Sequence, residues 1–222
     1  MVDQFPQPYS TISPTNAVFD FTEFSSGVSV VSYQCYNSQI TTTADHHMNS
    51  NNIHSDAVET VDDSTGFGTG SAAKTMDLDF DTAPFTFPQT LDGTSTVNVT
   101  AGFLHDAGAQ IDEFYIIAKI RRWDGSTETD LGSGQSRLYQ ASSANSWVSS
   151  NFTIPITITD ELIAEGQTLR LTIELWGNAG AAGASVDAAI GHSPFDLTGN
   201  IDPSTQDSNY NQTILNASFR RE

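Results

Sequence analysis

Cysteine and lysine are scarce in this sequence. Only one of its 222 residues is a cysteine, Cys35, so no disulfide can form within the chain. Lys74 and Lys119 are the only lysines, and eight basic residues stand against 27 acidic ones, which gives a formal net charge of −19. Since affinity for nucleic-acid phosphates comes from basic side chains, we expect no nucleic-acid partner.

Long apolar runs are also missing. No window approaches the length of a membrane span. The start MVDQFPQPYS has neither the basic residues nor the apolar run of a secretory signal. We therefore expect no signal peptide, no membrane partner and synthesis in a cytoplasm. The acidity is consistent with a docking face for a basic partner or with ordinary solvated surface, and the sequence leaves both open.

Recognisable catalytic motifs are absent as well. The sequence contains no G-x-S-x-G. The glycines of GFGTG (66–70) lack the lysine and the strand–turn–helix setting of a phosphate loop. Cys35 lies in the run SVVSYQCY and is predicted to be a buried small residue rather than a nucleophile. We predict no catalytic residue, no cofactor and no enzyme activity.

Alternation of apolar and polar residues is the clearest positive signal. In QTLRLTIELWG (167–177) the aliphatic positions 169, 171, 173 and 175 fall on one side of an extended strand. Positions 170, 172, 174 and 176 fall on the other side, which we expect to face water. This pattern is typical of a strand in an antiparallel sheet that packs on one side only.

The same design recurs along the chain and predicts about ten short strands with almost no helix. Asp124-Gly125 predicts a hairpin turn after a strand over 111–123, and Pro155 places the strand over 151–159 at a sheet edge. At 160–165 we expect one helical turn at most. The predicted fold is all-β, an antiparallel two-sheet β-sandwich of jelly-roll type; the missing Cys…Trp…Cys framework disfavours the immunoglobulin type. Further candidate strands span 17–24, 29–36, 76–80, 94–104, 128–131, 136–140, 186–190 and 213–219.

The chain is predicted to have an arm and one domain. Residues 1–17 contain Pro6, Pro8 and Pro14 and read either as an extended N-terminal arm that orders on a neighbour or as a frayed tail. Residues 18–222 are predicted to form a single β-sandwich domain. A long loop is expected at about 37–75, with missed short strands as the alternative.

Two groups of side chains invite comparison with metal sites. His46, His47 and His54 offer imidazoles, but their spacing matches no standard zinc site. Asp77, Asp79 and Asp81 share one strand face, where like charges repel unless a cation or a basic partner neutralises them. Calcium takes such ligands, yet a solvated face is favoured. We predict no metal site.

Four N-x-S/T sequons begin at Asn98, Asn151, Asn211 and Asn216. The sequence is so rich in Asn, Ser and Thr that most of them are expected by chance. Without a secretory signal they carry no functional prediction.

The stretches TETDLGSG (127–134), NFTIPITIT (151–159) and TLRLTIELWG (168–177) give the chain the texture of a known group. Over about 94–191 it resembles capsid decoration (cement) and related jelly-roll proteins of tailed bacterial or archaeal viruses. The resemblance implies a virion structural protein that binds the major capsid protein and copies of itself, often as a homotrimer, and that is located on the virion. The alternative is a carbohydrate-binding β-sandwich, such as a tail-fibre module.

A subunit interface is predicted around the polar side of 167–177. An exposed tryptophan can anchor a contact between subunits or stack on a sugar. The expected interface residues are Trp176, Arg170, Glu174, Trp147, Phe5 and Tyr9.

Overall fold

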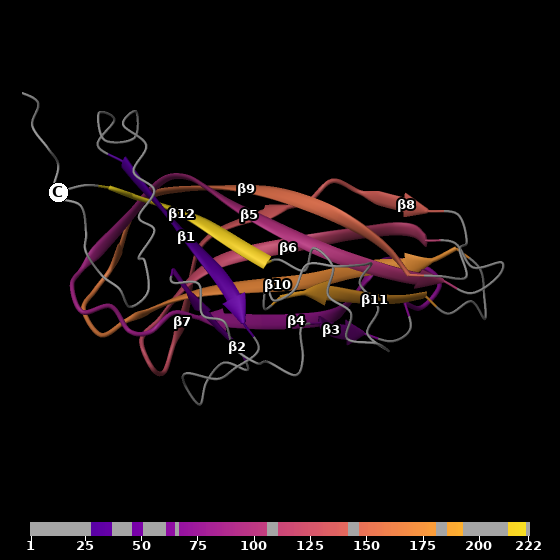
Figure 1. The fold of residues 1–222 in the computed structure, drawn as a ribbon, viewed down its shortest axis with the longest axis horizontal. Helices are drawn as coiled ribbons and strands as arrows, with labels where there is room; N and C mark the ends of the chain where they lie inside the picture. The colour runs from indigo at the N-terminus through magenta and orange to yellow at the C-terminus, as the bar shows by residue number, and fades with distance from the viewer. Residues whose placement is uncertain are drawn as a thin grey trace, which may run out of the picture.

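The computed structural model describes residues 28–36, 46–50, 61–64, 67–105, 111–141, 147–180, 186–192 and 213–220. These residues form twelve β-strands and no helix, which confirms the all-β prediction (Figure 1). The strands are β1 (Val28–Tyr36), β2 (His46–Asn49), β3 (Val61–Ser64), β4 (Ala73–Asp81), β5 (Gln89–His105), β6 (Ile111–Trp123), β7 (Glu128–Gln135), β8 (Tyr139–Ala141), β9 (Val148–Ile163), β10 (Thr168–Ala179), β11 (Val186–Gly191) and β12 (Thr213–Arg220).

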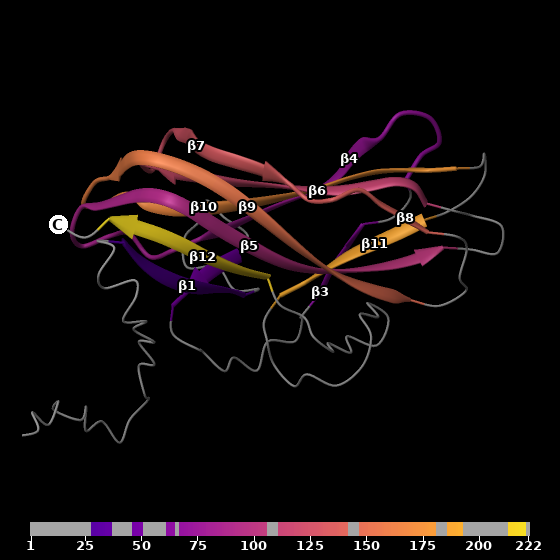
Figure 2. The ribbon, with the colours of Figure 1, turned by 90° about the horizontal axis from the view of Figure 1, so that it is seen from above.

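One large sheet contains all twelve strands. Its order is β3-β11-β5-β12-β1-β2-β4-β10-β6-β7, with β8 paired to β6 and β9 paired to β5. The sheet is mixed because β2 and β4 are parallel, through the pairs His46↔Phe80 and His47↔Asp81. Seen from above in Figure 2, β4, β6 and β7 lie on one side of the molecule and β1 and β12 on the other. The short strand β2 joins these two parts of the sheet.

The predicted inward faces are confirmed. On β10 the four aliphatic side chains Leu169, Leu171, Ile173 and Leu175 are all fully buried, because alternate residues of a strand point to the same face. The matching faces of β4, β5, β6, β9, β11 and β12 join them in one hydrophobic cluster. Cys35 is buried in the same cluster, as predicted.

The hairpin at Asp124-Gly125 is confirmed. Asp124 Oδ1 accepts hydrogen bonds from the backbone N–H groups of Ser126 and Thr127 at 2.9 and 2.8 Å, and Gly125 takes a positive φ of 95°. The return strand β7 is longer than predicted. It continues through Gly132 and Gly134, beyond the end expected at residue 131.

These two glycines let β7 lie directly against β9. A Cβ at Gly134 would stand 2.5 Å from the Pro155 carbonyl oxygen, and one at Gly132 would stand 2.9 Å from Cγ2 of Ile156. No L side chain fits that space, so the contact needs glycine. β7 and β9 therefore touch face to face, although neither forms a ladder with the other among the described strands.

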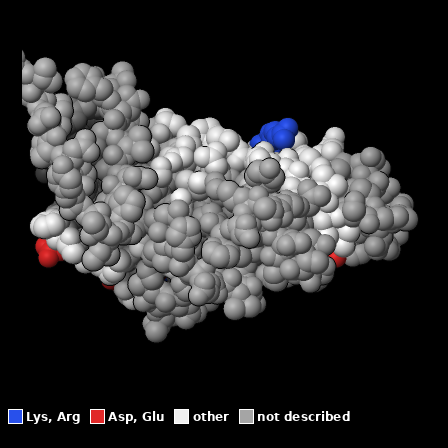
Figure 3. Space-filling model, in the orientation of Figure 1, with Lys and Arg blue, Asp and Glu red and all other residues white. Residues whose placement is uncertain are grey.

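β9 is an edge strand, as Pro155 predicts. Among the described strands it pairs with β5 alone, and Pro155 lies opposite Thr96 in that ladder. Over residues 94–100 and 151–157, the outer face of the β5–β9 pair is polar and uncharged. Thr153 Oγ1 donates to Asn98 Oδ1 at 2.8 Å, and Thr100 Oγ1 donates to Asn151 Oδ1 at 2.8 Å. In the view of Figure 3, most of the described surface that can be seen is neither acidic nor basic.

Several local expectations were wrong. The segment 37–75, expected as loop, contains β2, β3 and the start of β4, which was the stated alternative. The helical turn at 160–165 is instead the end of β9, followed by a turn at Glu165 and Gly166. The strand expected at 17–24 and the arm at 1–17, with Phe5 and Tyr9, lie outside the described residues. In the described ranges there is no helix suited to crossing a bilayer.

Candidate functional site

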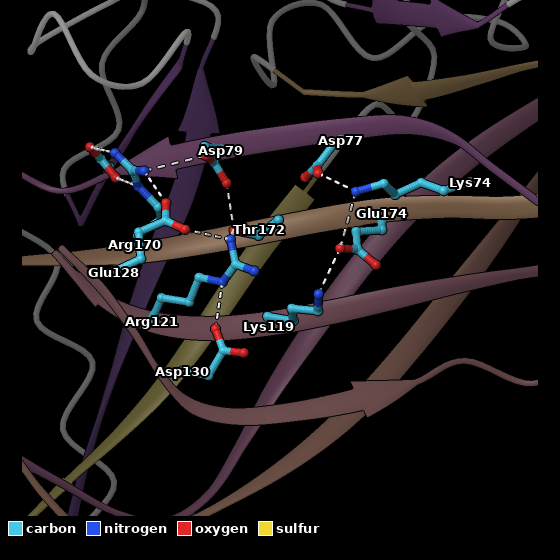
Figure 4. Close-up of polar contacts among 11 residues, drawn as sticks. Lys74, Asp77, Asp79, Lys119, Arg121, Glu128, Asp130, Arg170, Thr172 and Glu174 are labelled. Carbon is cyan, nitrogen blue, oxygen red and sulfur yellow. Dashed lines mark hydrogen bonds and ion pairs between the residues drawn. The ribbon is translucent and has the colours of Figure 1, made fainter.

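A network of charged side chains covers the outer face of β4, β10, β6 and β7 (Figure 4). It holds four of the chain's eight basic residues, so the scarce cations are concentrated on this face. The network has two parts. The Arg170 cluster consists of Arg170, Asp79, Asp81, Arg121, Thr172, Glu128 and Asp130. The Lys119 cluster consists of Lys119, Lys74, Asp77 and Glu174.

Arg170 is the centre of the first cluster. Its Nε and Nη2 donate to the two oxygens of Asp81 at 2.7 and 2.8 Å, the two-pronged geometry that suits guanidinium and carboxylate. Its Nη1 also reaches Asp79 and Glu128. The guanidinium carbon lies 4.8 Å from the ring centre of Trp123, within the range of a cation–π contact. β4 pairs with β10 in the register Arg170↔Asp81, which places these groups side by side.

Arg121 and Thr172 link the strands across the middle of the cluster. Arg121 donates to Asp130 at 2.7 Å, to Glu128 at 3.0 Å and to Thr172 Oγ1 at 3.1 Å. The Thr172 hydroxyl in turn donates a hydrogen bond to Asp79 Oδ1. One continuous chain of hydrogen bonds thus joins β7, β6, β10 and β4.

The Lys119 cluster is centred on Glu174 and holds Trp176 in place. Lys119 Nζ donates to Glu174 Oε1 at 2.7 Å, and the indole N–H of Trp176 donates to Oε2 at 2.9 Å. The Trp176 ring is parallel to that of Tyr115, with 6° between the planes and 6.2 Å between the centroids. Lys74 bridges from Asp77, at 2.6 Å, to Glu174. Trp176 is therefore fixed on both its edge and its face, while part of it stays exposed.

Burial and hydrogen bonding shift the pKa values of two carboxyl groups on this face in opposite directions. Burial raises the pKa of Asp79, and the hydrogen bond from Thr172 and the charge of Arg170 only partly offset it. Burial also opposes ionisation of Glu174, but hydrogen bonds from Lys119 and Trp176 outweigh it and lower the Glu174 pKa. The carboxylates around Arg170 raise its pKa despite desolvation, so it is a permanent cation.

The water-facing side expected for β10 was wrong. Arg170 is 3% exposed, Thr172 0% and Glu174 4%. Side chains of β6 contact all three: Trp123 contacts Arg170, Arg121 contacts Thr172 and Lys119 contacts Glu174. The row Asp77, Asp79 and Asp81 was expected as a solvated face, yet Asp81 is fully buried against Arg170. The basic partner considered for this row is thus Arg170 itself. The described residues bring together no three His, Cys, Asp or Glu side chains able to hold a metal ion.

Of the other predicted interface residues, only Trp147 belongs to the described part of the chain. Trp147 packs on Ala189, away from the charged network. Phe5 and Tyr9 lie outside the described residues. The structure thus brings Arg170, Glu174 and Trp176 together on one strand face and separates Trp147 from them. Their role as an interface stays a prediction.

The sequence analysis did not identify six members of the network as site residues: Lys74, Lys119, Arg121, Glu128, Asp130 and Thr172. It also missed Trp123, whose ring lies against Arg170. The one available signal was the alternation of polar residues on the outer side of 111–123 beside an expected hairpin. The nucleophile reading of Cys35 finds no support, because burial raises the pKa of its thiol well above the ordinary value and the thiolate is the reactive form.

No protein-family model matches the chain, and no curated protein matches it in sequence. Solved structures do match its fold. An α-amino acid ester hydrolase aligns at a TM-score of 0.52 and 7% identity, over 86% of this chain and 36% of its own. An aminopeptidase from the marine sediment archaeon Thaumarchaeota archaeon aligns at 0.53 and 8% identity, over 87% and 37%. A CocE/NonD family hydrolase from Staphylococcus aureus aligns at 0.52 and 9% identity, over 88% and 37%.

These matches correct the expected function. The three solved structures named above are hydrolases, which overturns the prediction of a virion structural protein, its tail-fibre alternative and the prediction of no enzyme activity. At 7–9% identity the likeness shows the fold alone. The chain spans a little over a third of the length of each hydrolase.

Proposed function

We propose that this chain is the β-domain of a hydrolase that cleaves esters or peptides. The observation that supports this is the extent of the match. Between 86 and 88% of the chain aligns with one part of three hydrolases, and that part is 36 or 37% of their length. The remaining part of such an enzyme has no counterpart in this chain, so the proposal includes a further catalytic region, on the same polypeptide or a separate one.

The proposal includes a finer description of the fold. In it, residues 18–222 form one domain, and the single sheet curls into a two-layer sandwich of jelly-roll type. Three features support this: the unpaired contact of β7 on β9, the hydrophobic cluster shared by strands from both parts of the sheet, and the separation of β4, β6 and β7 from β1 and β12 in Figure 2.

The test uses the protein in its natural full-length form, with any subunit that copurifies stoichiometrically. Hydrolysis of α-amino acid methyl esters and of aminoacyl p-nitroanilides is measured by product release. We expect turnover of at least one of the two classes, and we expect this turnover to fall when the β-domain is destabilised by Gly134→Ala. The matched variant Gly68→Ala, whose added Cβ meets nothing within 4 Å, should keep the activity.

Turnover of neither substrate class by the full-length protein or its complex would overturn the proposal. Turnover that is unchanged after deletion of residues 18–222 would overturn it as well, because the β-domain would then have no part in the enzyme.

A further inference from the structure

The outer face of β4, β10, β6 and β7 combines three properties of a protein-binding surface. It presents the aromatic residues Trp176, Tyr115 and Trp123, each partly exposed. The side chains beneath them are locked by ion pairs, so little rotamer freedom remains to be lost on binding. Tryptophan, tyrosine and arginine are the residue types that dominate the binding energy of interfaces.

Charge is distributed unevenly along this face, as Figure 4 shows. The Arg170 cluster sets two cations against four carboxylates, and its outermost side chain, Asp130, is 64% exposed. The Lys119 cluster sets two cations against two carboxylates, and its Lys74 is 38% exposed. One end is therefore acidic. The other end is balanced in charge, because the Lys74 ammonium is paired at 2.6 Å with Asp77, whose side chain is 44% exposed.

We propose that this face is a two-fold interface between two copies of the chain. In a two-fold contact, residue i of one copy meets residue j of the other, and the reverse contact occurs as well. Antiparallel placement of the two faces puts the Lys74 end of each copy over the Asp130 end of the other. Both contacts are then between opposite charges, with the aromatic residues between them.

The described outer face of the β5–β9 pair does not carry these aromatic residues. On the outer face of the described β5–β9 pair, the Asn98, Thr100, Asn151 and Thr153 side chains bond each other. The described outward positions of that pair carry neither an aromatic ring nor a lysine or arginine. Such a face offers no aromatic or basic anchor to a second copy of a chain with a net charge of −19.

The proposal is tested by mass and affinity of the purified chain in solution. Light scattering after size exclusion and sedimentation over a concentration series should show a dimer. The dimer should weaken as salt rises, because exposed charges are screened. Trp176→Ala should raise the dissociation constant by about 30-fold, the effect of losing a central aromatic anchor. Phe87→Ala is the matched control: Phe87 is 72% exposed but lies off this face, so its loss should change nothing.

Charge reversal gives the decisive experiment. Lys74→Glu and Asp130→Lys should each weaken the dimer of their own copies, since two like-charge contacts arise in each case. An equimolar mixture of the two variants should form a mixed dimer close to wild-type affinity, because both of its contacts are again between opposite charges. Circular dichroism of each variant checks that the fold is kept.

Three outcomes would overturn the proposal. The first is a monomer at every concentration, and the second is a trimer, which has no two-fold axis. The third is a dimer unaffected by Trp176→Ala and by both charge reversals. None of these measurements depends on hydrolase activity, so the interface and the proposed function fail or stand separately.

Discussion

Arg170 shows how one buried cation stabilises several strands. Its guanidinium is bonded to Asp81, Asp79 and Glu128, so its removal leaves carboxylates of β4 and β7 without their main counter-charge. A buried carboxylate without a partner carries a large desolvation penalty. The residue thus matters less for the net value of its ion pairs than for the penalty that follows its loss.

We expect Arg170→Met to lower the free energy of unfolding by about 3–5 kcal/mol, as for other broken buried ion pairs. The double variant Arg170→Met/Asp81→Leu should lose less, because the stranded Asp81 carboxylate is gone. Urea denaturation measures both. Lys74→Met serves as the control on an exposed pair and should cost about 1 kcal/mol or less. A loss of unfolding free energy in the double variant equal to the sum of the two single losses would contradict this account.

Glu174 and Asp79 should give the fold opposite responses to acid. The Glu174 pKa is lowered from its ordinary value of 4.5, so the unfolded chain takes up this proton first and stability falls as the pH drops through that range. The Asp79 pKa is raised from 3.8, so the folded chain takes up this proton first and gains stability over the same descent.

Urea midpoints between neutral pH and about pH 3 test this pair of shifts. Glu174→Gln should flatten the acid loss of stability, whereas Asp79→Asn should steepen it. Equal effects of the two substitutions on the acid dependence of stability would contradict the opposite pKa shifts of Glu174 and Asp79.

At the scale of the strand, inward faces could be predicted and pairing partners could not. Alternation identified the buried side of β10 because a strand repeats every two residues. The Arg170↔Asp81 register depends on β4 lying beside β10, which is a long-range fact that no local pattern carries. For the same reason the outer face of β10 was expected to be exposed to solvent.

Short strands and bulges were missed for local reasons. β2 and β3 have four residues each, too few for alternation to be seen. Asp92-Gly93 looks like a turn, but β5 passes through it with an irregularity in its ladder and Gly93 at a φ of 99°. In β9, Asp160 takes a φ of 53° instead of beginning a helix.

The glycines of β7 give a prediction at this scale. Gly134→Ala places a Cβ against the Pro155 carbonyl oxygen, so β7 must move away from β9. We expect a loss of about 1–3 kcal/mol in unfolding free energy, typical of overpacking. Gly68→Ala should stay close to wild type in the same chemical denaturation experiment. A stability unchanged by Gly134→Ala would show that β7 is free to shift.

For the whole molecule, the question is whether the two parts of the sheet unfold together. β2 connects them by only two residue pairs to β4, whereas one continuous hydrophobic cluster includes strands of both parts. The buried cluster is by far the larger contact, so we expect the two parts of the sheet to unfold together. The sequence could predict the residues of this core but not the narrow connection at β2.

We therefore expect a single cooperative transition in thermal and urea unfolding. In a variant with Trp123→Phe and Trp176→Phe, the fluorescence of Trp147 monitors unfolding beside β11. Far-ultraviolet circular dichroism monitors unfolding of the whole sheet. The two curves should coincide. Separate transitions would mean that β2 acts as a weak link between independently stable parts.

The reciprocal pairs Asn98–Thr153 and Asn151–Thr100 bear on how the protein is produced. Asn98 and Asn151 each begin an N-x-T sequon, and in a strand the asparagine and the threonine two residues on share one face. Passage through a eukaryotic secretory pathway would expose these amides to glycan transfer. A sugar chain on either asparagine would then cover part of the outer face of the β5–β9 pair. Expression in the cytoplasm of a bacterial host leaves this surface unmodified.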